Sequence, residues 1–150
     1  MKPPSSTREK PPEPVFFVDR NLGPIFVAIL RASSLRVESL EDHFEPSAPD
    51  TVWLPFVGSR GWVAVTHDQL RADPEEQTAL MIHGVKTFVL MGRAPHRALG
   101  ELFVRKIKRI KRLIESHDGP FLAKLYIETG EVKVTMSLED WMARQGRRWR

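Results

Sequence analysis

Three aspartates stand at the expected ends of strands or at the start of a helix. Asp19 directly follows the apolar run Val15–Val18, Asp68 follows the run Trp62–Thr66 by two residues, and Asp50 opens an expected helix between them. The carboxyl ends of parallel strands line one edge of an open α/β sheet, where ligands bind. Carboxylates that gather there repel one another, and a hard divalent cation relieves the repulsion. We therefore expect Asp19, Asp50 and Asp68 to bind Mg²⁺ or Mn²⁺, which activates a water and stabilises the charge that develops on a phosphodiester.

Other acidic residues are weaker candidates for the same metal site. Asp42 follows the second expected strand, Arg36–Leu40. Asp73 precedes a proline at the start of a helix, so it is better explained as an N-cap. Asp50 follows Pro49, and an N-cap role is open for it as well.

The composition excludes several other kinds of chemistry. The chain has no cysteine, which rules out disulfides, thiolate metal sites and cysteine nucleophiles. Its five histidines show no HExxH or other ligand spacing, so a zinc site is not expected. There is no GxxxxGK[ST] phosphate loop, and residues 19–23 read Asp-Arg-Asn-Leu-Gly where a dinucleotide-binding turn needs GxGxxG. A phosphotransferase with an aspartyl nucleophile typically has two acids at one strand end, and Asn21 occupies the second of these positions, which argues against that class of enzyme.

The elements that must position the aspartates alternate between strands and helices, which predicts one α/β domain with a mainly parallel sheet. With 150 residues, of which 41% are hydrophobic, the chain can bury one core. The predicted strands are Val15–Val18, Arg36–Leu40, Trp62–Thr66, Val85–Met91, Phe121–Ile127 and Val132–Thr135. The predicted helices are Ile25–Ala32, one from Asp50, one from Asp73 to about His83, a long one from Arg97 to His117 and a short one after Ser137. Residues 1–14, with five prolines, are expected to form a flexible tail, residues 15–143 the domain and residues 144–150 a basic C-terminal tail.

Positive charge is concentrated in the second part of the chain. Residues 97–150 contain 13 basic and 7 acidic side chains, whereas residues 1–96 contain 10 and 12. Lysine and arginine supply most non-specific affinity for nucleic acid. We expect this surface to bind RNA phosphates through Arg105, Lys108 and Arg112 on the long helix and through Arg20 and Arg71 near the acidic site. A purely solvated helix face explains the first three equally well.

No export signal or apolar membrane span is evident, which predicts a cytoplasmic protein. The terminal run that includes Trp149 offers either a base-stacking side chain or a contact for an acidic partner.

The order of motifs resembles that of the PIN-like nucleases, and most closely their VapC-like subgroup in bacterial toxin–antitoxin modules. The resemblance lies in four runs: Phe16-Phe17-Val18-Asp19-Arg20-Asn21-Leu22-Gly23, Glu41-Asp42-His43-Phe44, Pro49-Asp50-Thr51-Val52-Trp53-Leu54 and Arg60-Gly61-Trp62-Val63-Ala64-Val65-Thr66-His67-Asp68. It covers residues 15–91 well and the remainder more loosely.

This resemblance implies a three-layer α/β sandwich and Mg²⁺- or Mn²⁺-dependent cleavage of RNA, with Asp19, Asp50 and Asp68 as metal ligands. It also implies a cognate antitoxin as partner and allows a homodimer. Many PIN proteins have another acid two residues after the third, where this chain has Leu70. The number of metals therefore stays open, as do a DNA substrate and a non-catalytic module that binds RNA or protein.

Overall fold

The computed structural model of the chain describes residues 12–67 and 74–148. Residues 12–14 precede the first strand without regular secondary structure. Five residues named above lie outside the described residues: Asp68, Leu70, Arg71, Asp73 and Trp149.

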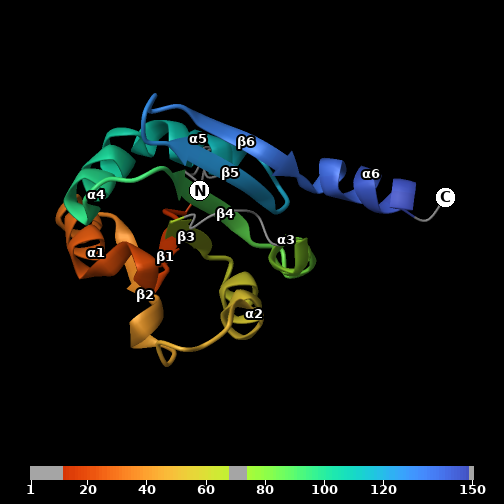
Figure 1. The fold of residues 1–150 in the computed structure, drawn as a ribbon, viewed down its shortest axis with the longest axis horizontal. Helices are drawn as coiled ribbons and strands as arrows, with labels where there is room; N and C mark the ends of the chain where they lie inside the picture. The colour runs from red at the N-terminus through yellow and green to blue at the C-terminus, as the bar shows by residue number, and fades with distance from the viewer. Residues whose placement is uncertain (1–11, 68–73, 149–150) are drawn as a thin grey trace, which may run out of the picture.

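A six-stranded sheet of order β2-β1-β3-β4-β5-β6 forms the centre of the molecule (Figure 1). The first five strands are parallel and β6 is antiparallel to β5. Their bounds are β1 Val15–Val18, β2 Arg36–Ser39, β3 Val63–His67, β4 Lys86–Met91, β5 Phe121–Tyr126 and β6 Val132–Ser137. The expected mainly parallel α/β sheet is confirmed.

Helices cover both faces of this sheet, as the short continuous apolar strands require. The α-helices are α1 Gly23–Ala32, α2 Asp50–Arg60, α3 Pro74–Ile82, α4 His96–Arg105, α5 Ile107–Ser116 and α6 Leu138–Arg148, with single 3₁₀ turns η2 Arg20–Leu22 and η3 Leu40–Asp42. One core lies between the sheet and α1, α4 and α5, and the other lies between the sheet and α2, α3 and α6. Alternate residues of β1 enter the two cores: Phe16 and Val18 face the first, and Phe17 faces the second.

The prediction of one long helix from Arg97 to His117 is wrong. The chain bends at Lys106, whose backbone N–H donates to the carbonyls of both Leu102 and Phe103. The two halves have different partners, because α4 packs against α1 and α5 packs against β6. The bend therefore lets the apolar residues of α4 and α5 pack on two different parts of the same core.

The last helix is longer than expected, since α6 continues through residues 144–148 of the segment expected to form a tail. It extends away from the sheet (Figure 1). Ser137 and Asp140 cap its start reciprocally: the Asp140 N–H donates to Ser137 Oγ, and the Ser137 N–H donates to Asp140 Oδ2, both at 3.1 Å. None of the helices in the described part of the chain is long and apolar enough to cross a membrane.

Candidate active site

Asp19 lies at the carboxyl edge of the sheet, where β1 has ended but pairing with β3 continues. Its backbone N–H donates to the Val65 carbonyl at 2.9 Å, and the Thr66 hydroxyl donates to its Oδ2 at 2.8 Å. Burial raises the pKa of the Asp19 carboxyl, the hydrogen bond from Thr66 lowers it, and the negative charge of Asp50 raises it again, with the net shift upward. Asp19 is thus half-buried, and its carboxyl group interacts electrostatically with the carboxylate of Asp50.

Asp50 is the first residue of α2, and Pro49 occupies the N-cap position without a side-chain cap. The carboxylate of Asp50 is therefore the acidic group of the first helical turn, and an N-cap role does not explain it. Its negative charge is one of the influences that raise the pKa of Asp19, so the two carboxylates interact electrostatically. Two carboxylates that repel each other, with only oxygen donors, fit a hard cation such as Mg²⁺ or Mn²⁺.

Asn21 holds the end of β3 by its side chain. Its Nδ2 donates to the His67 carbonyl at 2.8 Å and lies 3.3 Å from Thr66 Oγ1, while the His67 N–H donates to its Oδ1 at 3.2 Å. The carboxamide thereby acts as a strand partner for His67 beyond the last β1–β3 backbone pair, Val18 and Val65. We refer to these three contacts as the Asn21 clamp.

His67 is also held from the other side. Its Nε2 donates to the Gly92 carbonyl at 2.6 Å, just after the end of β4. The last described residue before Asp68 is therefore fixed between the ends of β1 and β4.

The third predicted ligand, Asp68, lies outside the described residues, as do Asp73 and Arg71. Within residues 12–67 and 74–148, no group of three or more histidine, aspartate or glutamate side chains forms a metal site by itself. Of the predicted ligands that are described, Asp50 is the one whose charge acts on Asp19.

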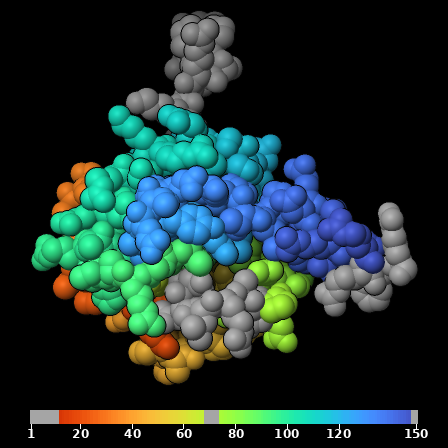
Figure 2. All heavy atoms as spheres, turned by 45° about the horizontal axis from the view of Figure 1, so that its top comes forward, coloured from red at the N-terminus to blue at the C-terminus, as the bar shows by residue number. Residues whose placement is uncertain are grey.

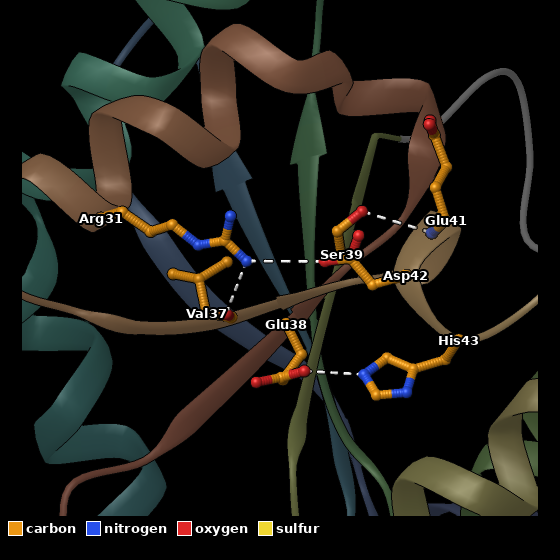
Figure 3. A network of polar contacts seen from close by, with 7 residues as sticks. All are labelled: Arg31, Val37, Glu38, Ser39, Glu41, Asp42 and His43. Atoms are coloured by element: carbon orange, nitrogen blue, oxygen red, sulfur yellow. Dashed lines mark hydrogen bonds and ion pairs between the residues drawn. The ribbon is translucent and has the colours of Figure 1, made fainter.

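Asp42 belongs to a different network, at the end of β2 (Figure 3). Its carboxylate lies 3.7 Å from the guanidinium of Arg31, which also donates to the Val37 carbonyl at 3.1 Å. Nearby, His43 Nε2 and Glu38 Oε1 are 2.7 Å apart. Asp42 thus pairs with α1, and its charge is not among the influences on the pKa of Asp19.

Of the predicted basic contacts, four are described, and all of them are exposed: Arg20, Arg105, Lys108 and Arg112. Arg20 follows Asp19 directly and is exposed beside the acidic pair. Arg105 ends α4, and Lys108 and Arg112 lie on α5, all three exposed. Helix α5 ends near the start of β4, opposite the carboxyl edge: Nζ of Lys86, the first residue of β4, donates to the Ile114 carbonyl at 2.8 Å.

Sequence reasoning missed the supporting roles of Asn21, Thr66 and His67. All three are polar residues within two positions of an expected catalytic aspartate, and that spacing was the available signal. Their partners lie 25 to 47 residues away in the chain, so pattern alone could not pair them.

Comparison with known families agrees with this arrangement. The model of the family described as PIN like domain matches residues 14–92, which is more than half of the chain and spans β1 to the end of β4. No curated protein and no solved structure matches. On the strength of that match, and with a sheet and acidic edge of the expected kind, the chain belongs to the PIN-like domain family.

Proposed function

We propose that this protein is a metal-dependent endoribonuclease that hydrolyses RNA phosphodiesters at the acidic edge of its sheet. The observation that carries the proposal is a half-buried Asp19 at the carboxyl edge of the sheet, hydrogen-bonded to Thr66 and influenced by the negative charge of Asp50. Membership of the PIN-like family supports it, since PIN-like domains are generally nucleases that use divalent metals.

Asp19, Asp50 and Asp68 would hold Mg²⁺ or Mn²⁺. When bound, such a cation activates a water and offsets the charge developing on the phosphodiester. Thr66 and the backbone N–H groups of Arg20 and Asn21 donate to Asp19, which fixes the orientation of its carboxylate. A carboxylate has about four acceptor positions, so capacity for a cation remains after these bonds.

The basic side chains would serve the substrate. Arg20 extends from the residue after Asp19 and is exposed, so it is positioned to bind a phosphate beside the acidic pair. Arg105, Lys108 and Arg112 would hold the strand farther away by charge alone, with the salt dependence that such contacts confer.

The test is cleavage of a labelled RNA in Mn²⁺ by Asp19→Asn and Asp50→Asn proteins. We expect each to lose more than about 100-fold in rate, because a neutral amide is a poor ligand for a hard cation. Asp42→Asn is the matched control, since it removes an exposed carboxylate of the same edge region that pairs with Arg31. Parent-like cleavage by both test variants would show that the acidic pair is not the active site.

A narrower form of the proposal is that the protein is the toxin of a type II toxin–antitoxin pair, as the VapC-like resemblance suggests. Induced expression in a bacterial host should then stop growth, and Asp19→Asn should abolish that effect. Co-expression of a small DNA-binding protein encoded next to it should restore growth. Growth that continues under parent expression would contradict the toxin role and leave the nuclease proposal standing.

A non-catalytic PIN-like module that binds RNA or protein is the second candidate. Leu70 favours it, because this apolar residue stands where many PIN proteins carry another acid. Calorimetric titration with Mn²⁺ separates the two functions: binding that disappears in Asp19→Asn supports the nuclease, and absence of such binding supports the module. Parallel cleavage assays with RNA and DNA of the same sequence decide the preferred nucleic acid.

A further inference from the structure

A cleft with a volume of about 650 Å³ lies at the carboxyl ends of β4 and β5. Its walls include Met91, Gly92 and Arg93 after β4, Tyr126 and Ile127 at the end of β5, and Lys133 on β6. The β5–β6 hairpin (blue) and the residues around the end of β4 (green) lie side by side on the face shown in Figure 2. Pockets for small organic groups span about 300–1,000 Å³, so this cleft has the size of a ligand site.

The cleft adjoins the candidate active site through one residue. Gly92 forms part of its wall, and the Gly92 carbonyl accepts the hydrogen bond from His67 that fixes the end of β3. Because β1, β3, β4 and β5 are parallel, Asp19 and the cleft lie on the same edge of the sheet, only two strands apart. The cleft and Asp19 therefore lie at the same ends of neighbouring strands, as two contacts with one strand of nucleic acid require.

The composition of the walls fits a nucleotide better than a phosphate alone. Met91, Tyr126 and Ile127 provide an aromatic and aliphatic surface for a flat ring. Arg93 is exposed and forms no ion pair within the described residues, so its guanidinium is available to a phosphate. The carboxylates of Glu128 and Glu131 balance the cations and can accept hydrogen bonds from base amino groups or sugar hydroxyls.

We propose that this cleft binds an unpaired nucleotide that adjoins the phosphodiester held at Asp19 and Asp50. The inference rests on the proposed function for the position of the scissile bond. Tyr126 stacks on the base and Arg93 binds the adjoining phosphate. A base inside a duplex cannot enter such a site, because it is already paired and stacked.

The wall formed by Tyr126, Ile127 and Lys133 lies beyond residues 14–92, the region matched by the family model. The nucleotide site thus combines the shared edge of the sheet with a hairpin that the match does not cover.

The first experiment measures binding of a fluorescein-labelled, short single-stranded RNA by anisotropy, with the full-length protein in EDTA so that cleavage does not intervene. Tyr126→Leu should weaken binding about 5- to 150-fold, because base stacking on one aromatic residue contributes about 1–3 kcal/mol. Tyr126→Phe keeps the ring and should bind within about twofold of the parent. Thermal melts of both variants establish that they are folded.

Arg93 provides a second variant whose exposed side chain is not needed for folding. Arg93→Ala should weaken binding and reduce the slope of log K against log salt by about 0.7 between about 50 and 200 mM salt, the value for one phosphate contact on a single strand. Arg36→Ala is the matched control: Arg36 is also exposed but begins β2, at the other end and other edge of the sheet. It should change neither the affinity nor the slope.

Two results would overturn the cleft proposal: parent-like binding by both Tyr126→Leu and Arg93→Ala, or equal competition by a blunt duplex and a single strand. These outcomes are distinct from failure of the proposed function. A parent protein that cuts RNA in Mn²⁺ while the cleft variants bind normally refutes the cleft alone. A parent that does not cut, but binds single strands through Tyr126 and Arg93, refutes the nuclease and retains the cleft.

Discussion

Replacing Asn21 with alanine is the most informative perturbation of the site that leaves its aspartates in place. The change removes all three contacts of the Asn21 clamp, two with the backbone of His67 and one with Thr66. The contact from Thr66 to Asp19 remains possible. The variant therefore separates the support of the end of β3 from the carboxylate itself.

The size of the effect follows from these contacts. An intramolecular hydrogen bond contributes about 1 kcal/mol net, and the three clamp contacts are part-buried, with one of them long. We expect a loss of about 2 kcal/mol in the free energy of unfolding. For a chain of this length, that corresponds to a fall of about 4–8 °C in Tm.

Cleavage should fall as well, by about 10- to 100-fold for the folded enzyme, which is the usual cost of losing a residue that orients a metal ligand. The physical reason is that the chain leaves β3 at His67 and reaches Asp68 at the next residue. The measurements are urea unfolding and RNA cleavage in Mn²⁺, the latter well below the Tm of the variant.

Ser39→Ala is the control for the loss of a side-chain hydrogen bond to the backbone. Ser39 ends β2 and accepts from the Glu41 N–H at 3.2 Å, a contact that involves neither Asp19 nor the Asn21 clamp. It should cost less stability and leave cleavage unchanged. An Asn21→Ala protein with the parent's Tm would show that the clamp contacts do not stabilise the fold. A destabilised variant that cleaves at the parent rate would show that the clamp does not position the site.

Three further predictions concern the charge, the basic surface and the core. Burial raises the pKa of Asp19, so its contribution to stability is full below its unfolded value of 3.8 and is lost as the pH rises through the folded pKa. Asp19→Asn should therefore raise the Tm of the metal-free protein at pH 7, with the difference shrinking below pH 3.8; a lower Tm at pH 7 would contradict the sign. Replacing Arg105, Lys108 and Arg112 together by alanine should leave the Tm unchanged and reduce the salt slope of RNA binding by about 2, whereas an unaltered slope would identify this surface as merely solvated. Phe103→Ala should cost about 3–5 kcal/mol in urea unfolding, because this fully buried ring packs edge-on against two other phenylalanines; a loss below about 1 kcal/mol would be inconsistent with that packing.

Most of the elements could be predicted from the sequence because their signals are local. The run Val15–Val18 predicts a strand buried on both faces, and β1 has those bounds. Helix α2 begins at Asp50 as expected, and Gly61 ends it in the left-handed conformation, with φ of 67°. These features depend on neighbouring residues, so a pattern of a few positions is enough to reveal them.

The bend at Lys106 shows where local signals fail. The segment from His96 to Lys106 contains one glycine, Gly100 in the middle of α4, and no proline, so no helix-breaking residue marks the bend. The apolar stripe also continues on both sides of it. The choice between one helix and two depends on the different partners of α4 and α5, which no local pattern encodes. The same holds for Asp42, whose pairing with Arg31 is set by the packing of α1 beside β2.

The sequence by itself determined the parallel α/β sheet and the position of Asp19 at the end of a strand, because hydrophobic periodicity and chain breaks act over a few residues. It also excluded thiolate metal ligands, since the chain has no cysteine. Only the tertiary structure decided that Asp50 shares the environment of Asp19, that Asn21 clamps the end of β3, and that a cleft adjoins the site beyond β4. Those contacts join residues far apart in the chain, and their energies depend on distances that exist only after the sheet has assembled.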